Sequence, residues 1–311
     1  MLFSDLVFTT TCPQHRFLEE MEQSVPWDWF EKQLCNAIHL KTGGRPPYPR
    51  IFLFRMHLLQ VWFGLSDAQT EFQCHDRLSF RKFLGVHLEG RIPDATTLEN
   101  FRHELEITGL GKKLIDRMDV WFQEQGLILK EGNLVDATFL RANSRPTPDP
   151  EMQSDIDAEH GYKGFGYSAT TNVDAKSKLI RKVVVDGNRA HDVTHLPAVL
   201  IGDEKELYAD SGYIGSETML NERGIKPHIC KRRVRGKAGE PTPELSDEDK
   251  DYNKKVARTR SRVEHPFACW KLNYRAARVW YRGLERVTQQ VYSLTLGYNL
   301  QRLGYLLRTA F

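Results

Sequence analysis

The chain has 311 residues and a net charge of +3, with 40% hydrophobic and 27% charged residues, which is typical of a globular protein with roughly two domains. No apolar stretch approaches the ~20 residues that cross a bilayer, and the N-terminus lacks the pattern of a secretion signal. Five scattered cysteines without a C-x-x-C pair argue against a zinc ribbon and favour reduced thiols. We expect a cytoplasmic protein without membrane contact.

The first 125 residues predict an all-helical domain. A Gly/Pro-rich stretch ends at Pro49, a favoured helix-start residue, and apolar residues then recur at helical spacing over residues 51–65. Ser66 and Asp67 can cap the next helix. Further helices are predicted around residues 27–30, 79–84, 93–105 and 111–125.

From residue 126 onward, short apolar runs alternate with helical segments. Strands are predicted over residues 133–140, 167–173, 179–185, 206–209 and 227–231, and helices over residues 192–200, over residues 216–223 and from Ser246 onward. This order predicts an α/β (α+β) fold, a mixed sheet covered by helices, over residues 126–311. The domain boundary is expected at residue 125.

Three acidic residues lie where an unpaired carboxylate is costly. Asp136 falls in the middle of the first strand, Asp210 at the carboxyl end of the fourth, and Glu264 in a basic helical stretch. Each alone is more typical of a solvated or salt-bridged residue, but together they favour a metal site. Two Mg²⁺ ions would offset their charge, activate a water and stabilise an in-line displacement at phosphorus.

Basic residues concentrate near the last acid. Residues 226–282 contain 16 Lys/Arg against 7 Asp/Glu, an excess that indicates contact with a DNA backbone, although a solvated face is the alternative. Arg260 and Lys271 share a predicted helical face with Glu264. The basic segment Lys231, Arg232, Arg233, Arg235 and Lys237 is a further candidate for DNA contact.

Two other features have both a functional and a structural interpretation. The helix that begins after Asp94 could recognise DNA, with phosphate and base contacts from Thr96, Thr97, Asn100 and Arg102, or could simply pack in a bundle. His191 and His195 have a zinc-compatible spacing, but no third ligand is evident, so a helix-cap or outer-sphere role is favoured.

Pro266 lies inside the predicted C-terminal helical stretch. Proline removes a helical hydrogen bond and clashes with the carbonyl four residues earlier. We therefore expect a kink just after Glu264, or a helix that starts afresh there.

Several motifs resemble one known family. They are G-R-P-P-Y-P, L-S-D-A-Q-T and I-P-D-A-T-T-L-E-N-F-R-H in the first domain, and V-D-A-T, A-D-S-G-Y-I-G and R-V-E-H-P-F in the second. The chain resembles DDE transposases of bacterial insertion sequences, in particular the insertion-sequence five group. Ala257 replaces a frequent Tyr of that family, and Ser168 and Thr170 stand where relatives typically carry Lys and His.

The resemblance implies a ribonuclease-H-like catalytic domain in which Asp136, Asp210 and Glu264 are the catalytic residues and bind two Mg²⁺ or Mn²⁺ ions. The implied enzyme is a transposase that cuts the ends of its element and joins each 3′-OH to target DNA. Its implied partners are double-stranded DNA, both terminal inverted repeats and target, and a second copy of the chain.

The resemblance further implies that the N-terminal domain binds DNA or dimerises, and that the enzyme is associated with the bacterial nucleoid. Two alternatives remain open: a metal-dependent DNA nuclease, and a non-catalytic DNA-binding protein that retains the fold. The intact set of three acids argues against the second alternative.

Overall fold

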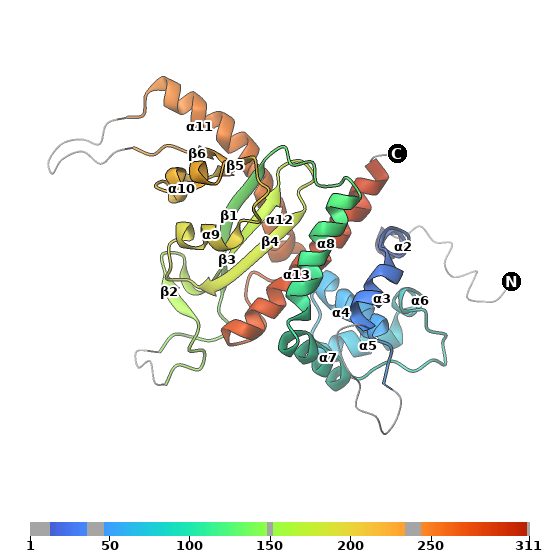
Figure 1. Cartoon of the computed structure of the whole chain (residues 1–311). Coiled ribbons are helices and arrows are strands. Elements are labelled where there is room, and N and C mark those ends of the chain that lie inside the picture. Colours follow the sequence, from blue (N-terminus) through green and yellow to red (C-terminus); the bar gives the residue numbers. More distant parts are fainter. Residues whose placement is uncertain (1–12, 36–46, 148–151, 234–243, 310–311) are drawn as a thin grey trace. The chain divides into compact units, whose positions relative to one another are not determined.

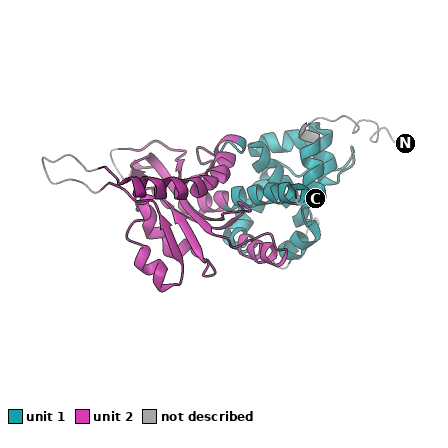
Figure 2. Ribbon diagram, turned by 90° about the horizontal axis from the view of Figure 1, so that it is seen from above, with its two compact units in different colours: residues 1–114, 273–275, 292–311 teal, residues 115–272, 276–291 magenta. Residues whose placement is uncertain are grey.

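The computed structural model describes residues 13–35, 47–147, 152–233 and 244–309 (Figure 1). Its contacts divide the chain into two compact units (Figure 2). The first comprises residues 1–114, 273–275 and 292–311, and the second residues 115–272 and 276–291. The predicted boundary at residue 125 between functional domains stays a prediction.

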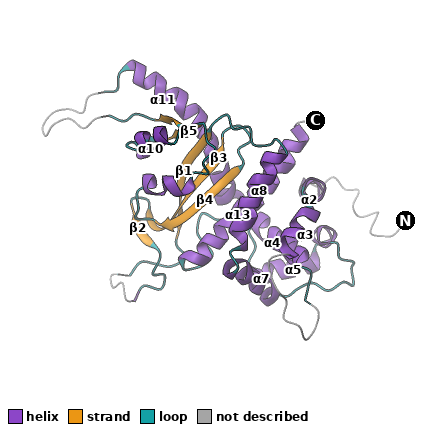
Figure 3. Cartoon of the chain, viewed as in Figure 1, coloured by secondary structure: helices purple, strands orange, loops and turns teal. Residues whose placement is uncertain are grey.

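The described part of the first unit is helical (Figure 3). Its elements are α2 (Pro13–Ser24), α3 (Trp27–Cys35), α4 (Arg50–Phe63), α5 (Asp67–Asp76), α6 (Leu78–Leu84), α7 (Ala95–Ile107), the start of α8 (Leu110–Glu124) and most of α13 (Leu284–Thr309). The predicted helices are confirmed, while α2 was not predicted. The predicted Ser66 cap is present, because its side chain accepts the N–H of Gln69.

The second unit contains a six-stranded mixed sheet, as predicted. Its strands are β1 (Asn133–Arg141), β2 (Glu159–Gly161), β3 (Gly164–Asp174), β4 (Ile180–Gly187), β5 (Glu206–Ala209) and β6 (Lys226–Ile229). The order is β2-β3-β1-β5-β6, and β4 also pairs with β3. β1, β3 and β4 run antiparallel, whereas β5 is parallel to both β1 and β6. β2 escaped prediction because it is three residues long in a polar segment.

Helical segments accompany the sheet. They are η2 (Asp192–His195), α9 (Leu196–Val199), η3 (Ser211–Tyr213), α10 (Glu217–Glu222), α11 (Asp247–Arg260), η4 (Ser261–Val263), α12 (Glu264–Ala268) and the π-helix η5 (Cys269–Asn273). α9 and α10 share a buried apolar cluster with alternate residues of β5, since Leu207 and Ala209 are buried while Glu206 and Tyr208 are half-buried.

A buried ion-pair network joins α8 to the sheet within the second unit. The fully buried Arg181 of β4 donates to both carboxylate oxygens of Asp119, at 2.8 and 3.0 Å, and to both of Asp203, at the same distances. A planar guanidinium suits such paired contacts. The network therefore fixes one end of β4 beside α8.

Two chemical features of the described residues complete the fold. Cys35, Cys74, Cys230 and Cys269 are free thiols, as expected. None of the helices in the described ranges combines the length and apolar character needed to cross a membrane.

Candidate active site

The register of the parallel strands brings two of the predicted acids level with each other. Asn133 of β1 pairs with Leu207 of β5, and the next residues pair in the same step. Two residues further along, Asp136 and Asp210 hold equivalent positions in this register, Asp210 directly after β5 ends, and the charge of Asp210 acts on the pKa of Asp136.

Asp136 is a mostly buried carboxylate held by a cation. One oxygen accepts from the guanidinium of Arg260 at 2.7 Å, and the other accepts from the N–H of Ala137 at 2.9 Å. Burial raises the pKa of Asp136 to about 6, the nearby Asp210 adds to this rise, and Arg260 and the Ala137 N–H oppose it. A further positive charge at this position would therefore be favourable.

Asp210 is positioned by the turn that follows β5. Its side chain accepts the N–H of Gly212 at 2.8 Å and so caps η3. A Cβ at Gly212 would lie only 2.9 Å from the same carboxylate oxygen. A side chain at this position would make the carboxylate move, so the glycine of the D-S-G-Y motif allows Asp210 to keep this direction.

Three cations surround this pair of acids. Arg260 bonds Asp136 directly, as described above. Burial lowers the pKa of Lys271, the charge of Lys163 lowers it further, and Asp136 opposes the shift, so both lysines lie within electrostatic reach of the site. Lys163 lies in the turn between β2 and β3 and was not predicted, because a lone lysine in a polar loop carries no sequence signal.

The helical run that carries Glu264 is broken, as Pro266 led us to expect. α11 ends at Arg260, a 3₁₀ segment follows, and α12 starts afresh at Glu264. The π-helix η5 then contains Lys271. The prediction of one continuous helical face for all three residues is therefore wrong.

The side chain of Glu264 is exposed. In the described part of the chain, no group of three or more His, Cys, Asp or Glu side chains is arranged to hold a metal ion. Asp136 and Asp210 nevertheless supply paired carboxylate oxygens, the donors that Mg²⁺ prefers. The catalytic and metal-binding roles of Asp136, Asp210 and Glu264 stay predictions.

The basic segment lies at the end of β6. Lys231 pairs with Asp249 of α11, whereas Arg232 and Arg233 are exposed and form no ion pair with any described residue. They border a hollow of about 950 Å³, whose wall includes Ile214 and Cys230. Arg235 and Lys237 lie outside the described residues. DNA contact by this segment stays a prediction.

The predicted recognition helix is α7. Asp94 caps it by accepting the N–H of Thr97 at 2.7 Å, and Thr96 and Asn100 are exposed. The guanidinium of Arg102 instead binds both oxygens of Asp67. This geometry favours a structural role for Arg102, while the DNA contacts of α7 stay predictions.

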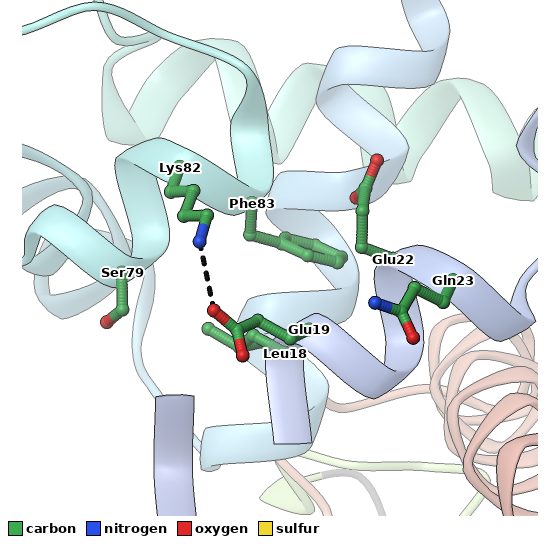
Figure 4. A pocket seen from close by; sticks show the side chains of 7 residues that line it. All are labelled: Leu18, Glu19, Glu22, Gln23, Ser79, Lys82 and Phe83. Atoms are coloured by element: carbon green, nitrogen blue, oxygen red, sulfur yellow. Dashed lines mark hydrogen bonds and ion pairs between the residues drawn. The ribbon is translucent and has the colours of Figure 1, made fainter. Parts of the chain in front are cut away.

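A pocket of about 330 Å³ lies in the first unit, and its lining residues are Leu18, Glu19, Glu22, Gln23, Ser79, Lys82 and Phe83 (Figure 4). Lys82 and Glu19 form an ion pair of 2.9 Å across it. None of the predicted site residues lines this pocket, so it is separate from the acidic site on the sheet.

The sequence matches two domain families. Residues 7–104 match a family described as a transposase domain, and residues 128–300 match the transposase DDE domain. Among solved structures, a chain from the crystal structure of the Mos1 strand transfer complex is 11% identical, with 82% of this chain and 87% of that chain covered. Its TM-score of 0.20 carries no structural argument.

Proposed function

Since the chain belongs to the transposase DDE domain family, we infer that it is a DNA transposase and propose that the acids on β1 and after β5 form its catalytic centre. Its mixed sheet is the ribonuclease-H-like sheet expected for that family. The observation that carries the proposed site is the register of β1 and β5, in which Asp136 and Asp210 hold equivalent positions, together with the effect of the Asp210 charge on Asp136. Membership of the insertion-sequence five group is part of this proposal.

The family depends on divalent metal ions, and we propose two Mg²⁺ or Mn²⁺ ions held by Asp136, Asp210 and Glu264. When bound, such ions activate a water and stabilise the charge that develops on a phosphodiester. The two aspartates would supply carboxylate oxygens as ligands. Glu264, exposed at the start of a short helix that follows a 3₁₀ segment, would supply the third carboxylate.

The cationic residues of the site orient its carboxylates and offset negative charge. Arg260 holds the carboxylate of Asp136 in a fixed direction, and Lys271 supports a negatively charged phosphate nearby. Hydrolysis at an element end frees a 3′-OH, which then attacks target DNA at the same centre. Neither step needs a covalent enzyme intermediate, so no nucleophilic side chain is required.

The proposed partners are the terminal inverted repeats, the target DNA and a second copy of the chain. The exposed Arg232 and Arg233 lie on the segment that follows β6, next to Cys230, which is within electrostatic reach of Asp210. Contacts from such residues to phosphates position DNA without reading its sequence. Two equivalent element ends suit a two-fold symmetric pair of chains.

The test is cleavage of terminal-repeat DNA by Asp136→Asn, Asp210→Asn and Glu264→Gln. The cleavage rate of each variant should be lower than that of the wild type by roughly 10³-fold or more, because each variant lacks a negative charge worth several kcal/mol to the reaction. Binding of the same DNA should persist in a gel-shift assay. The exposed Glu222→Gln is the matched control.

Joining of the cut 3′-OH to a target plasmid separates a transposase from a nuclease. Wild-type cleavage by any of the three amide variants would show that the substituted residue is not part of the catalytic centre. A wild-type protein that binds DNA but never cuts it would leave only the non-catalytic alternative.

A further inference from the structure

The turn between β2 and β3 exposes an aromatic residue. Tyr162 is fully exposed to solvent, and Lys163 beside it is exposed as well. These two residues form the whole loop of a hairpin, because Gly161 pairs with Gly164. Two-residue hairpin loops ordinarily contain Asn or Gly, whose backbones suit the turn. Neither burial nor turn geometry therefore accounts for an aromatic ring at this position.

The base of this hairpin is held by the residues that follow β4. The side-chain amide of Asn188 donates to the carbonyl of Gly164 at 2.7 Å. A Cβ at Gly161 would lie 1.9 Å from the backbone oxygen of Asn188, so the two backbones are in close contact. On β2, the Glu159 carboxylate accepts the N–H of Arg189 at 3.2 Å. The exposed loop is therefore anchored through both of its strands.

Two cations accompany the exposed ring. Lys163 shares the loop with Tyr162, and Arg189 lies beside β2 through its backbone contact. Both side chains are exposed, and neither forms an ion pair with any residue that the structure describes. The Glu159 carboxylate instead lies against the backbone of Gly187 and the Arg189 N–H. An exposed aromatic ring with neighbouring cations is typical of nucleic-acid binding, with the ring on a base and the cations at phosphates.

The hairpin is connected to the turn that holds Asp210 through short packed segments. Asn188, which anchors the hairpin, lies just before η2, and η2 packs against η3. The Asp210 side chain caps η3. Burial raises the pKa of Asp136, and the charge of Lys163 is among those that oppose the rise, which agrees with this placement. DNA bound at the proposed catalytic centre would therefore pass near the loop.

An exposed ring can stack on a base only where the face of that base is not covered by the next base pair. Such bases occur in single strands and at the ends of a duplex, and cleavage at an element end creates an end of this kind. Stacking of this type tolerates any base, because every base has a π-face. The loop therefore suits DNA that is locally unpaired.

We propose that the β2–β3 loop is a DNA contact in which the Tyr162 ring stacks on an unpaired base at the element end, while Lys163 and Arg189 contact neighbouring phosphates. The inference rests on the proposed function, because DNA is the substrate there. It adds an aromatic residue and two cations to the residues that the sequence motifs indicated for DNA contact.

The experiment measures binding of the full chain to a terminal-repeat duplex that ends in a short unpaired strand containing 2-aminopurine, a base whose fluorescence is quenched by stacking. The wild type and Tyr162→Phe should quench this fluorescence, whereas Tyr162→Ala should not. Tyr162→Ala should also bind this DNA roughly tenfold more weakly, the effect of losing one base–aromatic stack. Its affinity for the fully paired duplex should change little.

The exposed Ile156 on the preceding loop provides the matched control. Ile156→Ala removes an exposed apolar side chain without an aromatic ring, so quenching and affinity should equal those of the wild type. Thermal melts of all variants should coincide with the wild-type melt, because both substituted side chains are exposed.

The two cations are tested by the salt dependence of binding. Lys163→Gln and Arg189→Gln should each flatten the slope of log affinity against log salt by roughly 0.7 to 0.9, the value for one phosphate contact. Lys176→Gln, in the turn at the other end of β3, should leave the slope unchanged, since Lys176 pairs with Glu131.

Equal quenching and affinity in Tyr162→Ala and the wild type, while Asp136→Asn loses cleavage, would overturn the inference and leave the proposed function standing. A changed oligomeric state in Tyr162→Ala with unchanged DNA binding would also overturn it, because the loop would then be a contact between two copies of the chain. Failure of the wild-type protein to cut terminal-repeat DNA with Mn²⁺ would instead overturn the proposed function. The two failures are therefore distinguishable.

Discussion

Asp210 depends on a neighbour that has no side chain. Gly212 donates its N–H to the Asp210 carboxylate, and a Cβ on this residue would lie 2.9 Å from the same carboxylate oxygen, which would then have to move. The direction of this carboxylate is thus set by the backbone of the turn after β5, and the glycine of the D-S-G-Y motif is part of the site.

Gly212→Ala should therefore displace the Asp210 carboxylate. Misplacement by about 1 Å can cost on the order of 10²-fold in rate, so DNA cleavage should fall by roughly that factor. Because Gly212 is exposed, the melting temperature should change little. Cleavage assays and thermal melts of the same preparation check both parts, and full activity would show that the carboxylate does not need this direction.

The raised pKa of Asp136 predicts a pH dependence of stability. Its pKa rises from 3.8 to about 6 on folding, so the folded state binds more protons than the unfolded state between these values. This contribution is complete below pH 3.8 and is lost as the pH rises through 6. At ~1.4 kcal/mol per pKa unit, the loss is at most about 3 kcal/mol.

Urea unfolding of the metal-free protein between pH 4 and 7 measures this effect. The wild type should lose stability relative to Asp136→Asn as the pH rises, because the amide cannot become charged. Parallel pH profiles of the two proteins would contradict the assigned shift.

At the scale of elements, the buried network of Arg181 links β4 to α8. Arg181→Met should leave the buried Asp119 without its cation and destabilise the protein by about 3–5 kcal/mol. Lys176→Met is the control, since Lys176 pairs with Glu131 in an exposed bridge worth at most ~1 kcal/mol. Urea unfolding of both variants measures the difference, and equal effects would mean that burial of the network contributes nothing.

The C-terminal helical run shows how a local rule fails. Spacing alone predicted one face for Arg260, Glu264 and Lys271, yet Pro266 and the π-helix η5 change the angle between successive residues. The pattern identified the right neighbourhood, because Arg260 and Lys271 do face Asp136. It could not assign the orientation of each side chain.

At the scale of the whole molecule, the apolar residues of α13 do not provide a surface on which two chains could pair. Val291, Leu294, Leu296, Leu300 and Leu303 of α13 are all buried within the chain. The apolar side of this helix therefore belongs to the core and is not free to pair with a second copy.

We therefore expect a monomer in solution and at least two chains on paired element ends. Light scattering with and without terminal-repeat DNA measures this. A complex with one chain that still couples cleavage to joining would contradict the expectation.

The sequence by itself determined the elements and the chemistry of the acids. Alternating residues specify which face of β5 is buried, and the serine before α5 caps that helix through a contact three residues away. These are local effects, and so is the position of Asp210 directly after its strand. Family motifs then identified the reaction.

Only the tertiary structure decided which side chains meet. Asp136 and Asp210, 74 residues apart, hold equivalent positions because β1 and β5 pair in one register, and the charge of Lys163 reaches Asp136 from the turn between β2 and β3. Such convergence depends on long-range strand pairing and burial, which leave no periodic trace in the sequence. The raised pKa of Asp136 follows from the same cause, since distant segments exclude water from its surroundings.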